Sequence, residues 1–303
     1  MPARFATVRF LTIALAFFLA PACADSPSTA DALAEKVDVE APMQPTDEIE
    51  IRQGETTVRT APARGALVTS VVVDGKDLLT LDRRSFEETH RHVRGGIPIL
   101  FPFSGALKDG TLVASGTQMP QHGFAREKAW DVVSQSESEM VLGLSDDEAT
   151  RAVYPWPFRL TYTVRALDRG VEVVLTARNL GDSPMPTSPG WHPYFPLPVE
   201  AKPEFATSVE GAGGGTVTND REINFGVPSP PGSKLMFQLP GTGFLEMEYS
   251  ESMEHLQIWS LPRGAFVCVE PWDGGVNDIN TPGATVIAPG EMAEWRMAFR
   301  LNP

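Results

Sequence analysis

Cysteine, basic residues and long apolar segments are all scarce in this chain, and each scarcity argues against a class of protein. Only Cys23 and Cys268 occur among the 303 residues, which argues against a disulfide framework. The 25 Lys and Arg residues are outnumbered by 39 Asp and Glu residues, for a net charge of −14. Nucleic acids and anionic lipid surfaces repel such a chain, whereas a small anionic substrate can still bind at a local arginine cluster.

One pronounced apolar run lies near the N-terminus and is too short to span a membrane comfortably. It is the 11-residue stretch FLTIALAFFLA, preceded by two arginines and followed by small residues. This pattern predicts a secretory signal peptide over residues 1–24, and therefore an exported protein, either periplasmic or a membrane-anchored lipoprotein. Cleavage after Ala22 would leave Cys23 available for lipid attachment, the only membrane contact expected. Cleavage after Ala24 would remove that cysteine.

The remaining chain divides into a short linker and one domain. Residues 25–47 are rich in Ala, Asp, Glu, Pro, Ser and Thr, and cannot bury enough apolar surface to offset the entropy of ordering, so we expect a flexible linker. From residue 48 to 303 no change of composition demands a second domain. The 26 Gly and 27 Pro residues suit many short strands joined by turns better than a helical bundle.

Alternating apolar and polar residues predict an all-β fold. The clearest signal covers residues 158–180, where two alternating segments flank a turn at Asp168 to Gly170 and predict a hairpin with one buried face. No segment reads as an amphipathic helix of three turns. We therefore predict one large antiparallel β-sandwich. Further strands are expected at residues 67–73, 130–133, 140–144, 243–249, 255–260, 266–269 and 293–301.

Four segments punctuated by Gly and Pro hold ionisable side chains among aromatic ones, a setting that fixes an acid–base group in a partly desolvated position. They are RGGIPILFPFSG (94–105), QHGFAR (121–126), PGWHPYFP (189–196) and VCVEPW (267–272). Taken alone, His192 could equally be a structural histidine in an aromatic corner. Glu270 ends an apolar run, where a carboxylate is costly unless it is paired, exposed at a cleft or functional.

Together with TARNLGDSPMPTSPGWHPYF (176–195), these segments resemble the aldose 1-epimerase family over residues 48–300, most closely its glucose-6-phosphate 1-epimerase branch. The resemblance implies a galactose mutarotase-like β-sandwich acting on a small sugar. It implies that Glu270 is the general base for the anomeric hydroxyl and His192 the general acid for the ring oxygen. At neutral pH an unperturbed Glu is ionised and a His can still donate a proton.

The same resemblance suggests residues that hold the substrate. It makes His122 and Arg94 substrate-positioning groups, together with Arg126. An Asp that binds sugar hydroxyls is expected between the two catalytic residues, and Asp220 is the best candidate in this sequence. No metal and no organic cofactor is implied.

The identity of the sugar stays open between two classes. Relatives that act on hexose 6-phosphates are cytosolic, and sugar phosphates are scarce outside the cytoplasm, so the predicted export favours a free aldose. A phosphorylated hexose remains the alternative, with Arg94, Arg126 and Lys108 to hold its phosphate.

Two other functions compete with an epimerase. A metal-dependent, cupin-like enzyme would use His90 and His92 on one strand face, but the expected third ligand is replaced by Val93, Arg94 and two glycines. A non-catalytic carbohydrate-binding protein would use the same fold, and the presence of both His192 and Glu270 argues against it.

Overall fold

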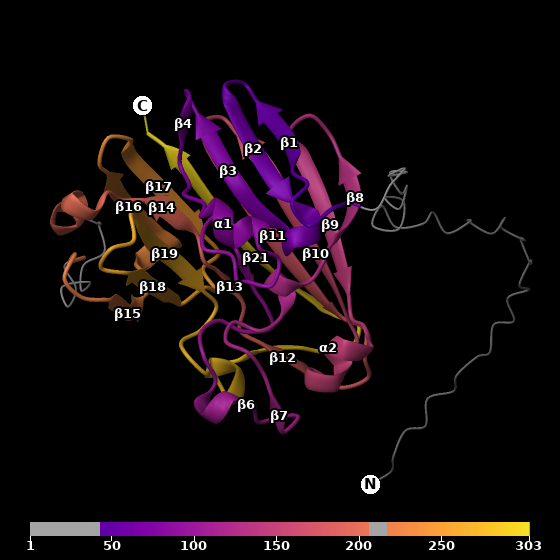
Figure 1. Cartoon of the computed structure of the whole chain (residues 1–303). Helices are drawn as coiled ribbons and strands as arrows, with labels where there is room; N and C mark the ends of the chain where they lie inside the picture. Colours follow the sequence, from indigo (N-terminus) through magenta and orange to yellow (C-terminus); the bar gives the residue numbers. More distant parts are fainter. Residues whose placement is uncertain (1–42, 206–216, 303) are drawn as a thin grey trace, which may run out of the picture. The chain divides into compact units, whose positions relative to one another are not determined.

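A computed structural model describes residues 43–205 and 217–302 of the chain (Figure 1). These described residues belong to one compact unit. The predicted signal peptide and most of the predicted linker lie outside the described residues. Within them, the two α-helices are α1 (Arg83–Glu87) and α2 (Glu148–Val153), and neither is long and apolar enough to cross a membrane.

The largest element is a seven-stranded antiparallel sheet, which contains the predicted hairpin. Strands β10 (Phe158–Leu167) and β11 (Gly170–Asn179) pair along their whole length, and the buried residues alternate along β10 as the sequence predicts. In spatial order the sheet contains β16 (Lys234–Leu239), β17 (Gly243–Tyr249), β21 (Met292–Leu301), β11, β10, β9 (Glu139–Ser145) and β8 (Asp131–Gln135).

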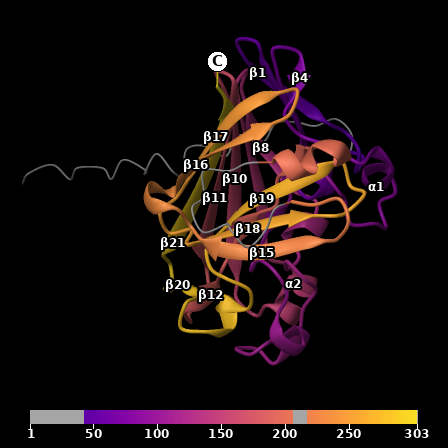
Figure 2. The same ribbon diagram turned by 90° about the vertical axis from the view of Figure 1, so that its left-hand side faces the viewer.

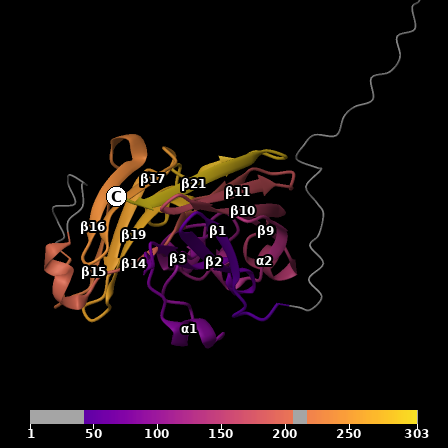
Figure 3. The same ribbon diagram turned by 90° about the horizontal axis from the view of Figure 1, so that it is seen from above.

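A four-stranded sheet packs over one part of this large sheet, against β10 and β11 (Figure 3). It consists of β1 (Ile49–Gln53), β2 (Thr56–Ala61), β3 (Leu67–Val73) and β4 (Lys76–Asp77). Buried residues from both layers, such as Val58, Val71 and Tyr162, join the main hydrophobic core. Burying both apolar faces in this way is what stabilises a β-sandwich.

A six-stranded sheet packs against the other part of the large sheet (Figure 2). The contact is aromatic, since the ring of Phe195 lies 5.0 Å from that of Phe237 and 5.2 Å from that of Phe299. The sheet contains β15 (Ile223–Pro228), β18 (His255–Ser260), β19 (Phe266–Trp272), β13 (Gly190–Trp191) and β5 (Ile99–Leu100), and β14 (Tyr194–Pro196) also pairs with β19.

Short elements complete the fold. Two small antiparallel pairs form, one from β6 (Thr111–Leu112) and β7 (Thr117–Gln118), the other from β12 (Met185–Thr187) and β20 (Thr285–Ile287). Of these strands, β6, β7 and β12 lie together at one end of the sandwich (Figure 1). The short 3₁₀ helices are Pro62–Arg64, Lys108–Gly110, Ala125–Glu127, Val199–Glu204, Pro231–Ser233 and Asp278–Asn280. The predicted all-β antiparallel sandwich is thus confirmed.

Strand β19 extends further than the sequence predicts, and this difference determines the site. The predicted strand ended at Val269, but the ladder continues through Glu270 to Trp272. Because side chains alternate along a strand, Val267 and Val269 enter the main core while Cys268, Glu270 and Trp272 point to the opposite face. Glu270 therefore stands inside a strand and is not a carboxylate at its end.

Candidate active site

His192 and Glu270 meet because β13 and β14, which flank His192, both pair in register with β19, which carries Glu270. Gly190 of β13 is opposite Trp272, and Tyr194 of β14 is opposite Cys268, which leaves His192 opposite Glu270. The His192 Nε2 atom lies 3.4 Å from Glu270 Oε1, and both side chains are buried. The two residues predicted to act as acid and base are therefore brought together by the backbone ladder.

Glu270 is held by an aromatic neighbour on its own strand. The indole N–H of Trp272 donates a hydrogen bond of 3.2 Å to Glu270 Oε2. The Trp272 indole is also stacked on the ring of His255, with ring centroids 5.3 Å apart and planes inclined by 24°. His255 Nε2 in turn contacts Oε1 of Gln257 at 2.9 Å. This chain of contacts restricts the carboxyl to one orientation, with Oε1 towards His192.

His192 is held by rings on two sides. It stacks on Tyr194, with centroids 4.7 Å apart and an interplanar angle of 12°, and it meets Trp259 edge-on at 5.5 Å. Trp259 is fixed from the far side, since its indole N–H donates to Glu222 Oε1 at 2.7 Å. Stacked rings limit the rotation of the imidazole and exclude water from it.

His122 approaches the pair from a different part of the chain. Its ring lies 5.5 Å from that of His192 and 6.0 Å from that of Trp272. The residue has a positive φ of 68°, and the backbone N–H of Gly105 donates to its Nδ1 at 3.0 Å. Because Nδ1 accepts a hydrogen bond, the ring proton is on Nε2, where it can be donated to a substrate oxygen.

Arg126 adds a positive charge beside the pair. Its side chain is mostly buried, donates to the carbonyl oxygen of Gln121 at 3.0 Å and lies 3.5 Å from the carboxylate of Glu127. Its charge acts on both Glu270 and His192. Arg94 is exposed, and its charge, like that of Arg126, acts on Tyr194.

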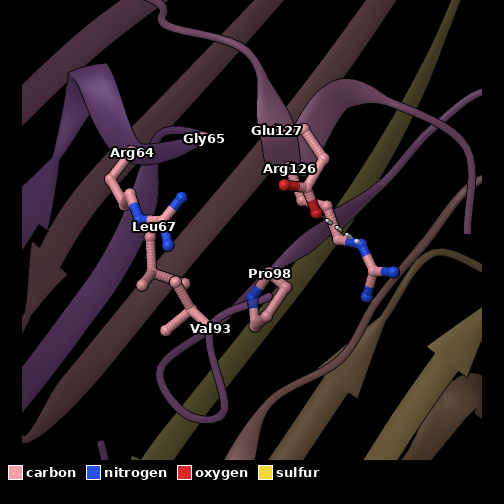
Figure 4. A pocket seen from close by; sticks show the side chains of 7 residues that line it. All are labelled: Arg64, Gly65, Leu67, Val93, Pro98, Arg126 and Glu127. Atoms are coloured by element: carbon pink, nitrogen blue, oxygen red, sulfur yellow. Dashed lines mark ion pairs between the residues drawn. The ribbon is translucent and has the colours of Figure 1, made fainter. Parts of the chain in front are cut away.

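A small pocket adjoins the site at Arg126 and contains neither member of the pair (Figure 4). Figure 4 shows the guanidinium of Arg126 pointing away from Arg64, which lines the opposite side. Arg64 has a structural task there, because it donates hydrogen bonds to the carbonyl oxygens of five residues, namely Ser85, Phe86, Glu88, Thr89 and Arg91. Since neither His192 nor Glu270 lines this pocket, the candidate active site is the face of β19 that carries Glu270.

Burial changes the protonation of the pair from what the sequence alone suggests. Desolvation raises the pKa of Glu270 well above its usual range, against smaller opposing effects of the Trp272 N–H and the Arg126 charge. Desolvation and the Arg126 charge lower the pKa of His192 to about 3. We infer that the pair is neutral overall near pH 7 and shares one transferable proton. Such a pair can take a proton from one oxygen and give one to another oxygen nearby.

Comparison with known proteins identifies the family. A family model described as aldose 1-epimerase matches residues 47–232. The chain belongs to the aldose 1-epimerase family. The resemblance noted in the sequence motifs is thereby confirmed.

Individual relatives of this aldose 1-epimerase family member agree in fold. A Salmonella typhimurium protein named "Putative glucose-6-phosphate 1-epimerase" is 28% identical over 127 residues, which span 41% of this chain and 39% of that protein. The crystal structure of a Synechocystis sp. PCC 6803 protein has a TM-score of 0.79 at 27% identity, covering 86% of this chain and 96% of that one. A galactose mutarotase related enzyme from Lactobacillus acidophilus has a TM-score of 0.68 at 20% identity, covering 85% and 98%.

The other site residues predicted for this aldose 1-epimerase family member do not all lie near the pair. Around the predicted acid–base pair the structure gathers His122 and Arg126, and the charge of exposed Arg94 acts on Tyr194. Asp220 is exposed in a bend before β15 and interacts electrostatically with its neighbour Arg221. Its role in substrate binding stays a prediction. Lys108 is also exposed, in a 3₁₀ helix.

The two histidines of the cupin-like alternative are not arranged as that reading requires. Residues 88–92 form a turn after α1, whose N-terminus is capped by the side chain of Asp82, and no strand carries His90 and His92. His92 contacts Glu127 through Nδ1 at 2.6 Å. Among the described residues, the group of three ligand-type side chains close enough to share an ion is instead His192, Cys268 and Glu270.

Proposed function

We propose that this chain is a sugar 1-epimerase, a mutarotase that interconverts the α and β anomers of an aldose. The observation that carries the proposal is the buried contact of 3.4 Å between His192 Nε2 and Glu270 Oε1. In a cyclic aldose the anomeric hydroxyl oxygen and the ring oxygen are both bonded to C1. An acid and a base this close together can therefore reach both oxygens at once.

The reaction needs no group beyond these side chains. The proton that the pair shares first passes from Glu270 to His192 across their 3.4 Å contact. Glu270, now a carboxylate, takes the proton from the anomeric hydroxyl, and His192, now an imidazolium, gives its proton to the ring oxygen. The C1–O5 bond breaks with its electron pair going to O5, leaving an open-chain aldehyde. Rotation about C1–C2 and closure with the reverse proton transfers give the other anomer. His122 and Arg126 are positioned to donate hydrogen bonds to substrate oxygens.

The substrate we favour is a free aldose, because the N-terminal sequence predicts export to a compartment poor in sugar phosphates. A hexose 6-phosphate is the second candidate, favoured by the two arginines around Tyr194 and by the printed name of the Salmonella relative. The test is anomer exchange by NMR with purified full chain, on a panel of free aldoses and on glucose 6-phosphate. Faster exchange of a free aldose supports the first candidate, and faster exchange of the phosphate alone supports the second.

Replacement of Arg126 by Gln is expected to move the whole pH–rate profile to higher pH. The positive charge of Arg126 lowers the pKa of both Glu270 and His192. When the charge is removed, both pKa values rise, and both limbs of the profile move to higher pH. Arg126→Lys keeps the charge and serves as the control. A profile that stays in place while KM rises would mean that Arg126 only holds the substrate.

Replacement of Trp272 by Phe is expected to lower kcat/KM by about 10- to 100-fold, the cost of one hydrogen bond to a charged group. The ring against His255 is kept, and only the N–H donor to Glu270 is lost. Since that donor lowers the pKa of Glu270, and Glu270 has the higher pKa of the pair, the alkaline limb of the pH–rate profile moves to higher pH while the acid limb stays. An unchanged alkaline limb would refute the positioning role of Trp272.

A further inference from the structure

The face of β19 that carries the proposed base also carries a buried thiol to which the proposed reaction gives no role. Cys268 and Glu270 are two residues apart on one strand, so their side chains leave the same face. Tyr194 is the register partner of Cys268, and His192 is opposite Glu270. The side-chain ligand atoms of His192, Cys268 and Glu270 all lie within 4.8 Å of one another.

These three donors have the chemistry of a mononuclear zinc site. Thiolate, imidazole and carboxylate are the protein ligands that Zn²⁺ takes, and three of them leave a fourth position for water. A thiolate and a carboxylate together balance the charge of a divalent ion, which matters because all three residues are buried. Within the described residues, the Nδ1 atom of His192 is buried with no hydrogen-bond partner, so no hydrogen bond to that nitrogen is lost when the imidazole binds a metal.

We propose that a borderline-soft divalent cation of the Zn²⁺ class binds His192, Cys268 and Glu270 and switches the active site off. The ion occupies the lone pairs that the acid–base pair needs for proton transfer. Binding displaces the proton of the Cys268 thiol and the proton shared by the pair, and both are released to solvent. The inhibition rests on the proposed epimerase activity, whereas the binding of the ion does not.

The nearby charge of Arg126 sets a limit on this site. It opposes a cation, so we expect Zn²⁺ to bind reversibly, and an added chelator to restore activity. Harder cations such as Mg²⁺ prefer oxygen donors and are not expected to inhibit.

The decisive experiment uses Co²⁺ as a spectroscopic stand-in for Zn²⁺ on the full chain. A thiolate-to-cobalt charge-transfer band in the near ultraviolet is expected for wild type and is displaced by added Zn²⁺. Cys23→Ser should keep the band, and Cys268→Ala should lose it. Zn²⁺ affinity should fall at least about 100-fold in Cys268→Ala, since losing even an outer-shell partner of a metal site costs about 10- to 100-fold.

Activity provides the second readout. Without metal, Cys268→Ala should exchange anomers at the wild-type rate, and Zn²⁺ should inhibit wild type but not the variant. If that variant does not fold, Cys268→Ser keeps the side-chain size and weakens the ligand. Absence of the band in wild type, or equal inhibition of wild type and variant, would overturn the proposal. If wild type shows the band but no epimerase activity, the metal site stands and the proposed function fails.

Discussion

Replacing Glu270 by Gln is expected to reduce kcat/KM for anomer exchange by about 100- to 10,000-fold, the usual contribution of a positioned acid or base. Gln has the shape of Glu and can still accept the hydrogen bond from Trp272, so the site should remain folded. What it cannot do is take the proton of the anomeric hydroxyl. The measurement is the NMR exchange rate between anomers under saturating and limiting sugar.

The same experiment extends to His192, because both residues transfer protons in the same ring-opening step. His192→Asn should lose a similar factor, and the double variant should be no worse than either single one, since groups that act as a unit are not additive. Glu137→Gln is the matched control, since it makes the same change at an exposed carboxylate between β8 and β9 that takes no part in the site. Losses that multiply in the double variant would show that the two side chains work independently.

Replacing Asp273 by Asn is expected to stabilise the protein above pH 6 by about 3 kcal/mol. Burial raises the pKa of Asp273 from 3.8 to about 6, helped by the charges of Glu254 and Asp278, against hydrogen bonds from Trp295 and Thr285. A raised acid pKa means that the folded state binds the proton more tightly than the unfolded state. The wild type therefore loses stability as pH rises from about 4 to 6, at about 1.4 kcal/mol per pKa unit.

Asn removes this titration while keeping an oxygen for the 2.6 Å hydrogen bond from the Trp295 indole. Urea unfolding at pH 3 and pH 8 measures the effect. The two proteins should differ little at the lower pH, where the carboxyl is mostly protonated in both the folded and the unfolded state. Asp131→Asn, at an exposed position of β8, is the control and should change little at either pH. If Asp273→Asn stabilised the protein equally at both pH values, the ionisation of Asp273 would not be the cause of the stabilisation.

Alternation of apolar and polar side chains made the long strands predictable. Strands without a clear alternation were missed. The hairpin at 158–180 and the strands at 243–249 and 255–260 appear as expected. Strand β15 was missed because Gly226 and Pro228 interrupt its pattern, although Gly226 is needed there: a Cβ on it would lie 2.1 Å from the ring of His255. The hairpin of β1 and β2 was missed because its sequence is largely Thr, Arg and Glu.

The proposed acid–base pair could be named from motifs, but its surroundings could not. Trp259 and Gln257 join the site through strand pairing, and Glu222 joins it through its hydrogen bond with Trp259. In the sequence, a polar residue on a site-facing strand looks like one that faces solvent. The expected carboxylate at Asp220 stands in a bend, two residues before the Glu222 that contacts Trp259.

Protonation could not be predicted from the sequence either. Reference pKa values suggested an ionised Glu270 and a His192 ready to donate. The structure buries both side chains, which moves their pKa values in opposite directions. This difference arises from packing of the aromatic side chains Tyr194, Trp259 and Trp272 around the pair.

The most direct test of the account is magnetisation transfer between the C1 signals of the two anomers of a ¹³C1-labelled aldose. With wild-type protein the account predicts exchange faster than the spontaneous rate, and loss of that gain with Glu270→Gln. The methyl glycoside of the same sugar, which lacks the proton of the anomeric hydroxyl, should not exchange. If the sugars bind and none exchanges faster, the acid–base pair is idle and the chain is a carbohydrate-binding protein.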